Sequence, residues 1–299
     1  MEEKELRVNV GAGFEMVIPL QYEMLMHNAE EEINRRLMNY RRAMKLWTIL
    51  NKDPEVKANW DIANFIAVRK LKYNDHGEVH AKLVAANALR MLDILLSRGI
   101  MPDIMREGAG EDDDVHLVVL AAGLLHDIGN VVHRFNHPLH SVYLATSILN
   151  RVLPEIYDNP EIMYEMRNHI LHCIYAHSAE IKDLTIEASL IGIADGTDMT
   201  RGRGRLAFDT GNVNIHTVSA LAIKDVEIRE GRDRPIEILI KMTNSAGIFQ
   251  VQETLVPKIV GSPLEPHVEI VAYTEPPGVE TDERIVQRLI IREGKLVPK

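Results

Sequence analysis

Hydrophobic and polar positions repeat with a helical period over the first two thirds of the chain. From Pro19 to Asn51, apolar residues recur every three or four positions with charged residues between them, which predicts one long amphipathic helix. Helical spacing continues from Asp61 to Arg203, interrupted by turn signals such as 108–114. Strand-like alternation is nearly absent there, so this part of the chain is predicted to be a helical domain.

The pattern changes after Arg205. Apolar residues then alternate with polar ones around Val226, Ile236 and Val268, and Arg284–Arg292 is predicted to be a last strand. Residues 247–261, between the second and third strands, have helical spacing. An order of strand, strand, helix, strand, strand favours a small α+β domain with one helix packed on a sheet, loosely similar to ferredoxin-like modules.

The fold class is therefore predicted to be mainly α with an α+β end. A chain of 299 residues is long enough for two domains. We divide it into an N-terminal helical segment (1–69), a helical domain (70–205) and a C-terminal module (206–299). The module is expected to act in regulation or oligomerisation. Pro257 predicts a kink or an earlier end of the module's helix.

Composition and charge narrow the possible partners. The chain is 46% hydrophobic and 26% charged, which is typical of a folded globular protein. Its formal net charge of -10 disfavours binding to a nucleic-acid polymer, but it allows a local basic pocket for one phosphate. Apolar runs such as Leu117–Leu125 are shorter than the roughly 20 residues that span a bilayer. The acidic N-terminus does not resemble a signal peptide, and the single cysteine, Cys173, fits a reducing compartment. We expect a cytoplasmic protein that does not bind membranes.

Histidines concentrate in the predicted helical domain. Ten of the 13 histidines lie between His76 and His177. A lone histidine in a helix is more often structural than a ligand, but these come together with carboxylates. The pair His126-Asp127 directly follows the apolar run 117–125, and Gly129 can end that helix. An imidazole nitrogen beside a carboxylate suits a divalent cation that takes mixed nitrogen and oxygen ligands.

Other histidines and a distant carboxylate extend this set. His76 and His80 are four residues apart and share one helical face, so either is a candidate ligand. Downstream candidates are His137 and His140 at the start of one predicted helix, and His169, His172 and His177 on another, while Asp195 ends an apolar segment. Asp127 and Asp195 would supply the negative charge that a buried cation requires.

These residues resemble the HD superfamily of metal-dependent phosphohydrolases. Its order of a first His, an adjacent His-Asp and a distant Asp is met by His80, His126-Asp127 and Asp195. The sequence Leu-Leu-His-Asp-Ile-Gly at 124–129 is similar to the family's central motif. The similarity covers residues 70–205. It implies a helical phosphohydrolase domain that binds one or two divalent ions: Mn, Fe, Mg or another metal.

The resemblance also implies a second metal position. His137 and His177 are the best matches for it, with Asp127 bridging both ions, and His133, His140 and His172 remain alternatives. Asn130 stands where the family motif often continues with Lys. Ser178 stands where the cyclic-dinucleotide branch has a second adjacent His. The resemblance therefore does not extend to hydrolysis of cyclic dinucleotides.

The implied chemistry is attack of a metal-activated water on phosphorus. His76 is a candidate general acid, and Asp127 is a candidate catalytic residue as well as a ligand. Arg201, Arg203 and Arg134 are candidates for binding the substrate phosphate, since guanidinium groups suit phosphate geometry. A basic linker between domains explains Arg201 and Arg203 equally well.

The leading functional hypothesis is hydrolysis of a small phosphomonoester or phosphodiester, with a nucleotide as the favoured substrate. The alternative is a non-catalytic, metal-bound sensor or scaffold that signals through the C-terminal module. A homodimer formed through the N-terminal helix is a further hypothesis.

Overall fold

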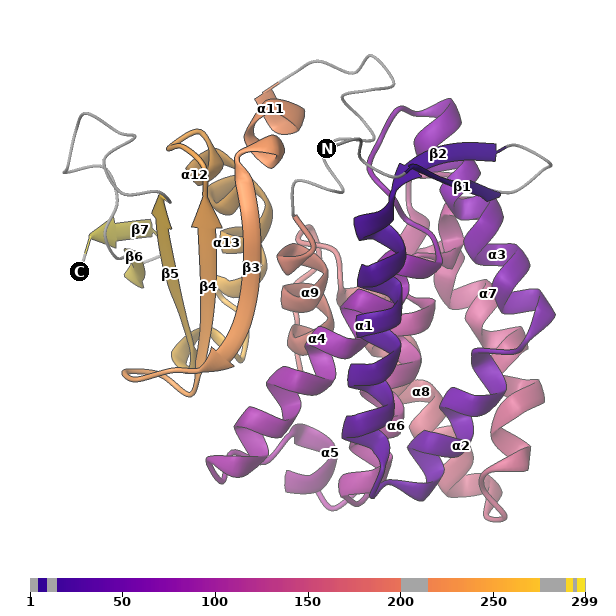
Figure 1. Ribbon diagram of the computed structural model, residues 1–299. Helices are drawn as coiled ribbons and strands as arrows, with labels where there is room; N and C mark the ends of the chain where they lie inside the picture. Colours follow the sequence, from indigo (N-terminus) through magenta and orange to yellow (C-terminus); the bar gives the residue numbers. More distant parts are fainter. Residues whose placement is uncertain (1–4, 10–14, 200–214, 275–288, 293–294, 299) are drawn as a thin grey trace.

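A helical body and a small α+β module lie side by side in the computed structural model (Figure 1). The structure describes residues 5–9, 15–199, 215–274, 289–292 and 295–298. The longer helices of the body are α1 Leu20–Leu37, α2 Arg41–Leu50, α3 Pro54–Asn64, α4 Glu78–Ser97, α6 Asp112–Leu125, α7 His137–Val152, α8 Pro160–Ala176 and α9 Ile186–Thr197. Shorter helical segments, among them the π-helix Phe65–Lys70 and α5 Asp103–Arg106, connect them. The prediction of a mainly helical protein with a small sheet near its C-terminus is confirmed.

Helix α6 forms the centre of the helical body. Every residue from Asp114 to Leu125 is buried, and α2, α4, α8 and α9 all pack against it. Gly123 allows the close approach of α4, because a Cβ there would lie 2.7 Å from the Ala85 Cα. The stretch Asp112–Val131 is apolar and long enough to cross a membrane, but 94% of its apolar window is buried in the protein. It is therefore a core helix.

The predicted single helix from Pro19 to Asn51 is wrong, because two helices occupy this segment. Helix α1 ends at Leu37, and α2 begins at Arg41. The Asp113 carboxylate of α6 accepts hydrogen bonds from the backbone N–H groups of Arg42 at 2.9 Å and Ala43 at 3.0 Å. A side chain distant in the sequence thus caps the start of α2. The apolar spacing continues across the break, so the pattern alone does not reveal it.

The N-terminal residues add a hairpin that the sequence did not predict. Strand β1, Glu5–Asn9, pairs antiparallel with β2, Glu15–Pro19. The hairpin precedes α1 directly and is drawn at the top of the helical body in Figure 1.

The C-terminal module contains the predicted strands and helix. Strand β3 (Ile223–Glu230) pairs antiparallel with β4 (Ile236–Met242), which pairs parallel with β5 (Val268–Thr274). The parallel connection runs through a helical segment of three parts: α12 Gly247–Gln250, a π-helix Val251–Leu255 and α13 Val256–Ile259. A short helix, α11 Ile215–Leu221, precedes β3.

The last strands form a separate two-stranded sheet. Strand β6, Leu289–Arg292, pairs with β7, Lys295–Pro298, and falls within the strand predicted at 284–292. The first part of that prediction lies outside the described residues.

Pro257 was predicted to cause a kink or an earlier end of the module's helix. The helix does not end there, because α13 continues to Ile259. Pro257 occupies the first turn of α13, directly after the π-helical segment, where a missing backbone N–H is tolerated.

The module packs against the helical body through this helix and through β3. Helix α9 contacts both α13 and the π-helical segment, and α4 contacts β3. One hydrophobic cluster includes residues of both parts, with Leu255 and Ile259 from the module beside Ile191 and Ala194 from α9. The end of α9 therefore lies against the module.

Candidate metal centre

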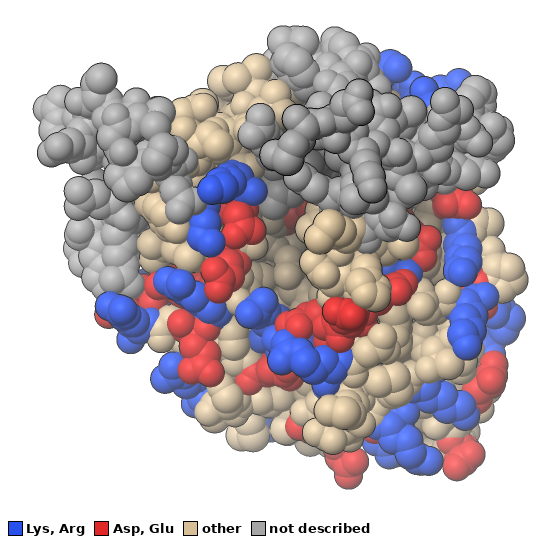
Figure 2. All heavy atoms as spheres, in the orientation of Figure 1, with Lys and Arg blue, Asp and Glu red and all other residues tan. Residues whose placement is uncertain are grey.

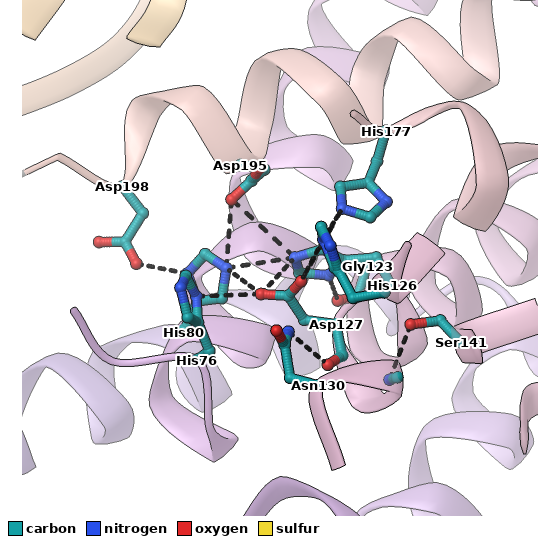
Figure 3. A network of polar contacts seen from close by, with 12 residues as sticks. His76, His80, Gly123, His126, Asp127, Asn130, Ser141, His177, Asp195 and Asp198 are labelled. Atoms are coloured by element: carbon teal, nitrogen blue, oxygen red, sulfur yellow. Dashed lines mark hydrogen bonds and ion pairs between the residues drawn. The ribbon is translucent and has the colours of Figure 1, made fainter. Parts of the chain in front are cut away.

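Seven candidate polar side chains converge where the ends of several helices meet (Figure 3). His80 lies in the first turn of α4, and His126 and Asp127 follow α6. His137 is the first residue of α7, and His177 follows the last residue of α8. Asp195 is in the last turn of α9, and Asp198 follows that helix.

His80 is the most fully engaged histidine of the centre. Its ring is completely buried, and its Nδ1 lies 2.6 Å from Asp198 Oδ2. Its Nε2 lies 3.2 Å from Asp195 Oδ1 and 3.4 Å from Asp127 Oδ2. An ionised carboxylate only accepts hydrogen bonds, so Asp198 fixes the proton on Nδ1. The Nε2 lone pair then points toward Asp127 and Asp195.

Backbone carbonyls orient three further histidines in the same way. The Nδ1 atoms of His126, His137 and His177 lie 2.9, 3.1 and 2.6 Å from the carbonyl oxygens of Gly123, Arg134 and Ile174, respectively. A carbonyl oxygen cannot donate, so each Nδ1 carries the proton and each Nε2 is left as an electron-pair donor. This orientation is typical of histidines that bind metal through Nε2.

The histidine Nε2 atoms face one another in pairs. His80 Nε2 lies 3.1 Å from His126 Nε2, and His137 Nε2 lies 3.1 Å from His177 Nε2. Two unprotonated nitrogens at this distance repel each other unless a cation is placed near both lone pairs. The donor set therefore fits a divalent cation.

Asp127 lies between the two histidine pairs. Its Oδ2 faces His80 Nε2 at 3.4 Å and His76 Nδ1 at 3.1 Å. Its Oδ1 faces His137 Nε2 at 3.1 Å and His177 Nε2 at 3.8 Å. Its two oxygens thus point to different groups of nitrogen ligands, which is the arrangement that two bridged ions would require.

Several groups of three ligand atoms are close enough to share one ion. The atoms lie within 4.8 Å of one another in His76, His80 and Asp127; in His80, His126 and Asp195; and in His126, Asp127 and His177. His76 therefore belongs to one of these groups, so it is a candidate ligand as well as a neighbour of Asp127. Its backbone N–H donates to Asn64 Oδ1 at 3.3 Å, which fixes the turn before α4.

The electrostatics of the centre favour a neutral His126 beside charged Asp127 and Asp195. Burial and the neighbouring His80 lower the pKa of His126 to about 4, although Asp127 opposes this change. Burial would raise the pKa of Asp127, but His126, His76 and His137 outweigh it and hold that pKa well below the usual range. Burial likewise opposes the low pKa of Asp195, which Lys258 and His80 maintain. These protonation states are the ones that metal binding requires.

Among the described residues, the alternative histidines His133, His140 and His172 form no ion pair with Asp127 or Asp195. His133 is exposed, and its Nδ1 accepts a hydrogen bond from the Phe135 backbone N–H at 2.9 Å. His140 Nδ1 lies 3.4 Å from the His133 carbonyl oxygen. His172 Nε2 is buried on α8. His137 and His177, in contrast, both face Asp127 Oδ1, so the structure brings these two histidines to the centre.

The predicted arginines fall into two groups. Arg134 Nη1 lies 3.7 Å from Asp127 Oδ1 and donates to Asn130 Oδ1 at 3.3 Å. It therefore stands at the edge of the centre. Arg201 and Arg203 lie outside the described residues.

Sequence reasoning missed the roles of two residues. Asp198 lies shortly after the predicted ligand Asp195, and a carboxylate in such a position is a signal for a supporting role. Lys258 donates to Asp195 Oδ2 at 2.6 Å and comes from the C-terminal module. No spacing in the sequence relates it to the histidines.

A cavity of about 520 Å³ opens beside the metal-like cluster. The helical body contributes His76, Arg134, His137, His177, Asp195 and Asp198 to its lining. The module contributes Thr217, Gln250, Thr254 and Lys258, among others. The cavity has a volume typical of small-molecule sites. Any molecule bound there would touch both parts of the protein.

Comparison with known proteins gives two matches. Residues 75–200 match the family model described as HD domain. An uncharacterized protein of Methanocaldococcus jannaschii is 46% identical over 226 residues, which cover 76% of this chain and 87% of that protein. No solved structure matches the chain significantly.

Proposed function

The chain belongs to the HD family of metal-dependent phosphohydrolases, and on this premise we propose that it hydrolyses a small phosphomonoester or phosphodiester. The observation that carries the proposal is the position of Asp127 between two pairs of facing histidine Nε2 atoms. A metal-binding cluster that opens onto a cavity of about 520 Å³ supports binding of a substrate next to the ions.

Two divalent ions are proposed to bind, with Asp127 shared between them. His80, His126 and Asp195 would hold one ion, and His137 and His177 the other. When bound, such ions supply an acidified water and polarise a phosphoryl oxygen. Mixed nitrogen and carboxylate ligands favour Mn or Fe over Mg, which prefers oxygen ligands and retained waters.

The side chains around the cavity are proposed to complete the reaction. His76 is buried and lines the cavity beside Asp127, from where it would donate a proton to the leaving oxygen. Arg134 also lines the cavity and would orient a phosphate through its guanidinium group. Arg201 and Arg203 remain predictions for the same role.

A nucleotide is the favoured substrate class. The cavity is large enough for a phosphate and an attached ring system, and its lining mixes amide, hydroxyl and imidazole groups. Basic and acidic side chains are interspersed among the described residues on the face shown in Figure 2. This surface supports the proposal of a small substrate over a nucleic-acid polymer. A cytoplasmic location and a homodimer also remain predictions.

The test is a metal-loaded hydrolysis assay. The native chain would be supplied with Mn²⁺ and assayed against an aryl phosphate and a panel of nucleoside mono-, di- and triphosphates. Asp127→Ala should abolish turnover, whereas Asp158→Ala, which removes an exposed carboxylate that is not part of the cluster, should leave it intact. Metal binding without hydrolysis of any compound would favour the sensor or scaffold hypothesis. Absence of metal binding would refute the proposed site.

A further inference from the structure

One ammonium group of the C-terminal module reaches the candidate metal centre. Lys258 Nζ donates to Asp195 Oδ2 at 2.6 Å and to the carbonyl oxygen of His177 at 2.9 Å. The lysine side chain is only 10% exposed. A single buried ammonium group therefore joins the ends of α8 and α9. His177 directly follows α8, and Asp195 is in the last turn of α9.

Asp195 has separate contacts for each of its carboxylate oxygens. Oδ2 accepts from Lys258, whereas Oδ1 faces His80 Nε2 at 3.2 Å and His126 Nε2 at 3.9 Å. The lysine consequently leaves free the oxygen that points to the histidines. A charge-assisted hydrogen bond to the outer oxygen restricts rotation of the carboxylate and keeps Oδ1 directed at the cluster.

Packing of the module onto α9 holds the lysine in this position. Gly196 follows Asp195, and a Cβ there would lie 3.1 Å from Lys258 Cδ and 3.2 Å from Leu255 Cδ1. The glycine thus lets the lysine stem and the π-helical segment lie close to α9. Leu255 is completely buried in the cluster shared with α9, so the contact is part of the core.

The same module forms one wall of the cavity. Gln250 and Thr254 line it together with Lys258, across from His137 and Arg134 of the helical body. Gln250 Nε2 donates to Thr254 Oγ1 at 2.7 Å, and Ser219 Oγ donates to Gln250 Oε1 at 3.1 Å. These hydrogen bonds order the polar wall that the module presents to the cavity.

We propose that Lys258 is a positioning residue, through which the C-terminal module fixes Asp195 and the end of α8 in the geometry needed for metal binding and hydrolysis. This inference rests on the proposed function for its catalytic part. It assigns the module a role in completing the site, beyond regulation or subunit contact.

Metal affinity provides a test that does not depend on turnover. The full chain, stripped of metal with a chelator, would be titrated with Mn²⁺ by calorimetry. Lys258→Met should weaken binding about tenfold or more, the range for residues that orient metal ligands. Lys258→Arg keeps the positive charge and should restore part of the loss. Lys241→Met is the matched control, because Lys241 lies on β4 and pairs with Asp225 at 3.2 Å.

A double-mutant cycle tests whether Lys258 acts through Asp195. The loss of affinity in Lys258→Met and in Asp195→Asn should be non-additive, because each change breaks the same contact. In the hydrolysis assay, Lys258→Met should lower kcat more than it changes KM.

If circular dichroism shows that Lys258→Met does not fold, Gly196→Ala provides a second variant. Its methyl group would displace the lysine stem and should weaken Mn²⁺ binding in the same direction.

The outcomes separate this inference from the proposed function. Unchanged Mn²⁺ affinity and kcat in Lys258→Met, with an active native chain, would overturn only the positioning role. A higher kcat in Lys258→Met would also overturn the positioning role, because the Lys258 ammonium group would then slow hydrolysis instead of supporting it. A tenfold loss of affinity in Lys258→Met, together with a native chain that hydrolyses nothing, would support positioning and reject the phosphohydrolase proposal. A native chain that binds no Mn²⁺ would reject both.

Discussion

At the residue scale, the orientation of each histidine ring decides whether its Nε2 atom faces the metal-like cluster. His80 is directed by Asp198, whereas His126, His137 and His177 are directed by backbone carbonyls. Their Nε2 atoms face inward for this reason, whereas the Nδ1 of His133 accepts a local hydrogen bond from the Phe135 backbone N–H. A sequence can reveal which histidines are available, but the tautomer depends on a partner from another turn or helix.

Asp198→Asn tests the role of the orienting carboxylate. The amide has no negative charge to favour the His80 Nδ1–H, so Mn²⁺ affinity should fall about tenfold while the fold is retained. Calorimetric titration would measure the effect, with Asp225→Asn on β3 as a control of equal charge change. Equal affinities in Asp198→Asn and the native chain would show that Asp198 does not orient the ring.

His116 is a buried histidine outside the metal-like cluster, with a structural role. Its Nδ1 lies 2.8 Å from the Asp112 carbonyl oxygen, and its Nε2 lies 3.1 Å from Asp93 Oδ1. Burial alone would lower its pKa, but hydrogen bonds with Asp112 and Asp93 outweigh burial and raise the pKa to about 9. The folded state therefore holds the proton more tightly than the unfolded state does.

The sign of the resulting pH dependence follows from this raised pKa. The stabilisation by protonated His116 should be complete below the unfolded pKa of 6.5 and lost as pH rises through about 9. The shift corresponds to roughly 3 kcal/mol at most. Urea unfolding of the native chain and His116→Gln at pH 6 and pH 10 would measure it. The variant should be less stable mainly at pH 6, and an equal deficit at both pH values would contradict the assignment.

At the element scale, contacts distant in sequence decide where helices begin. Helix α2 starts at Arg41 because Asp113 of α6 accepts its first free N–H groups. The apolar spacing from Pro19 to Asn51 predicted one helix, since a periodic pattern does not register such a cap. By contrast, the strands around Val226, Ile236 and Val268 were predictable, because alternation with a buried face is a local signal.

The cap on α2 gives a prediction about stability. Asp113→Ala should lower the free energy of unfolding by about 1 kcal/mol, because two backbone N–H groups lose their acceptor. Thermal and urea unfolding would measure the change. Asp158→Ala, at an exposed carboxylate before α8, should have a much smaller effect. Similar losses in the two variants would indicate a general charge effect instead of a specific cap.

At the scale of the whole molecule, the part of the candidate site within the helical body was largely predictable, but the contribution of the C-terminal module was not. The resemblance implied His80, His126, Asp127, His137, His177 and Asp195, and the structure brings all six together. Lys258 could not be found this way, because its role depends on how the C-terminal module packs on α9. Arg201 and Arg203 lie outside the described residues, so their proposed phosphate contacts stay predictions.

The number of ions bound per chain tests the central claim most directly. Asp127 has one oxygen directed at each histidine group, so the account predicts two Mn²⁺ per native chain, measured by calorimetry and elemental analysis. Asp127→Asn should bind fewer than two with weakened affinity, whereas Asp158→Asn should still bind two. A native chain that binds one ion or none, or an Asp127→Asn variant that still binds two with native affinity, would contradict the account.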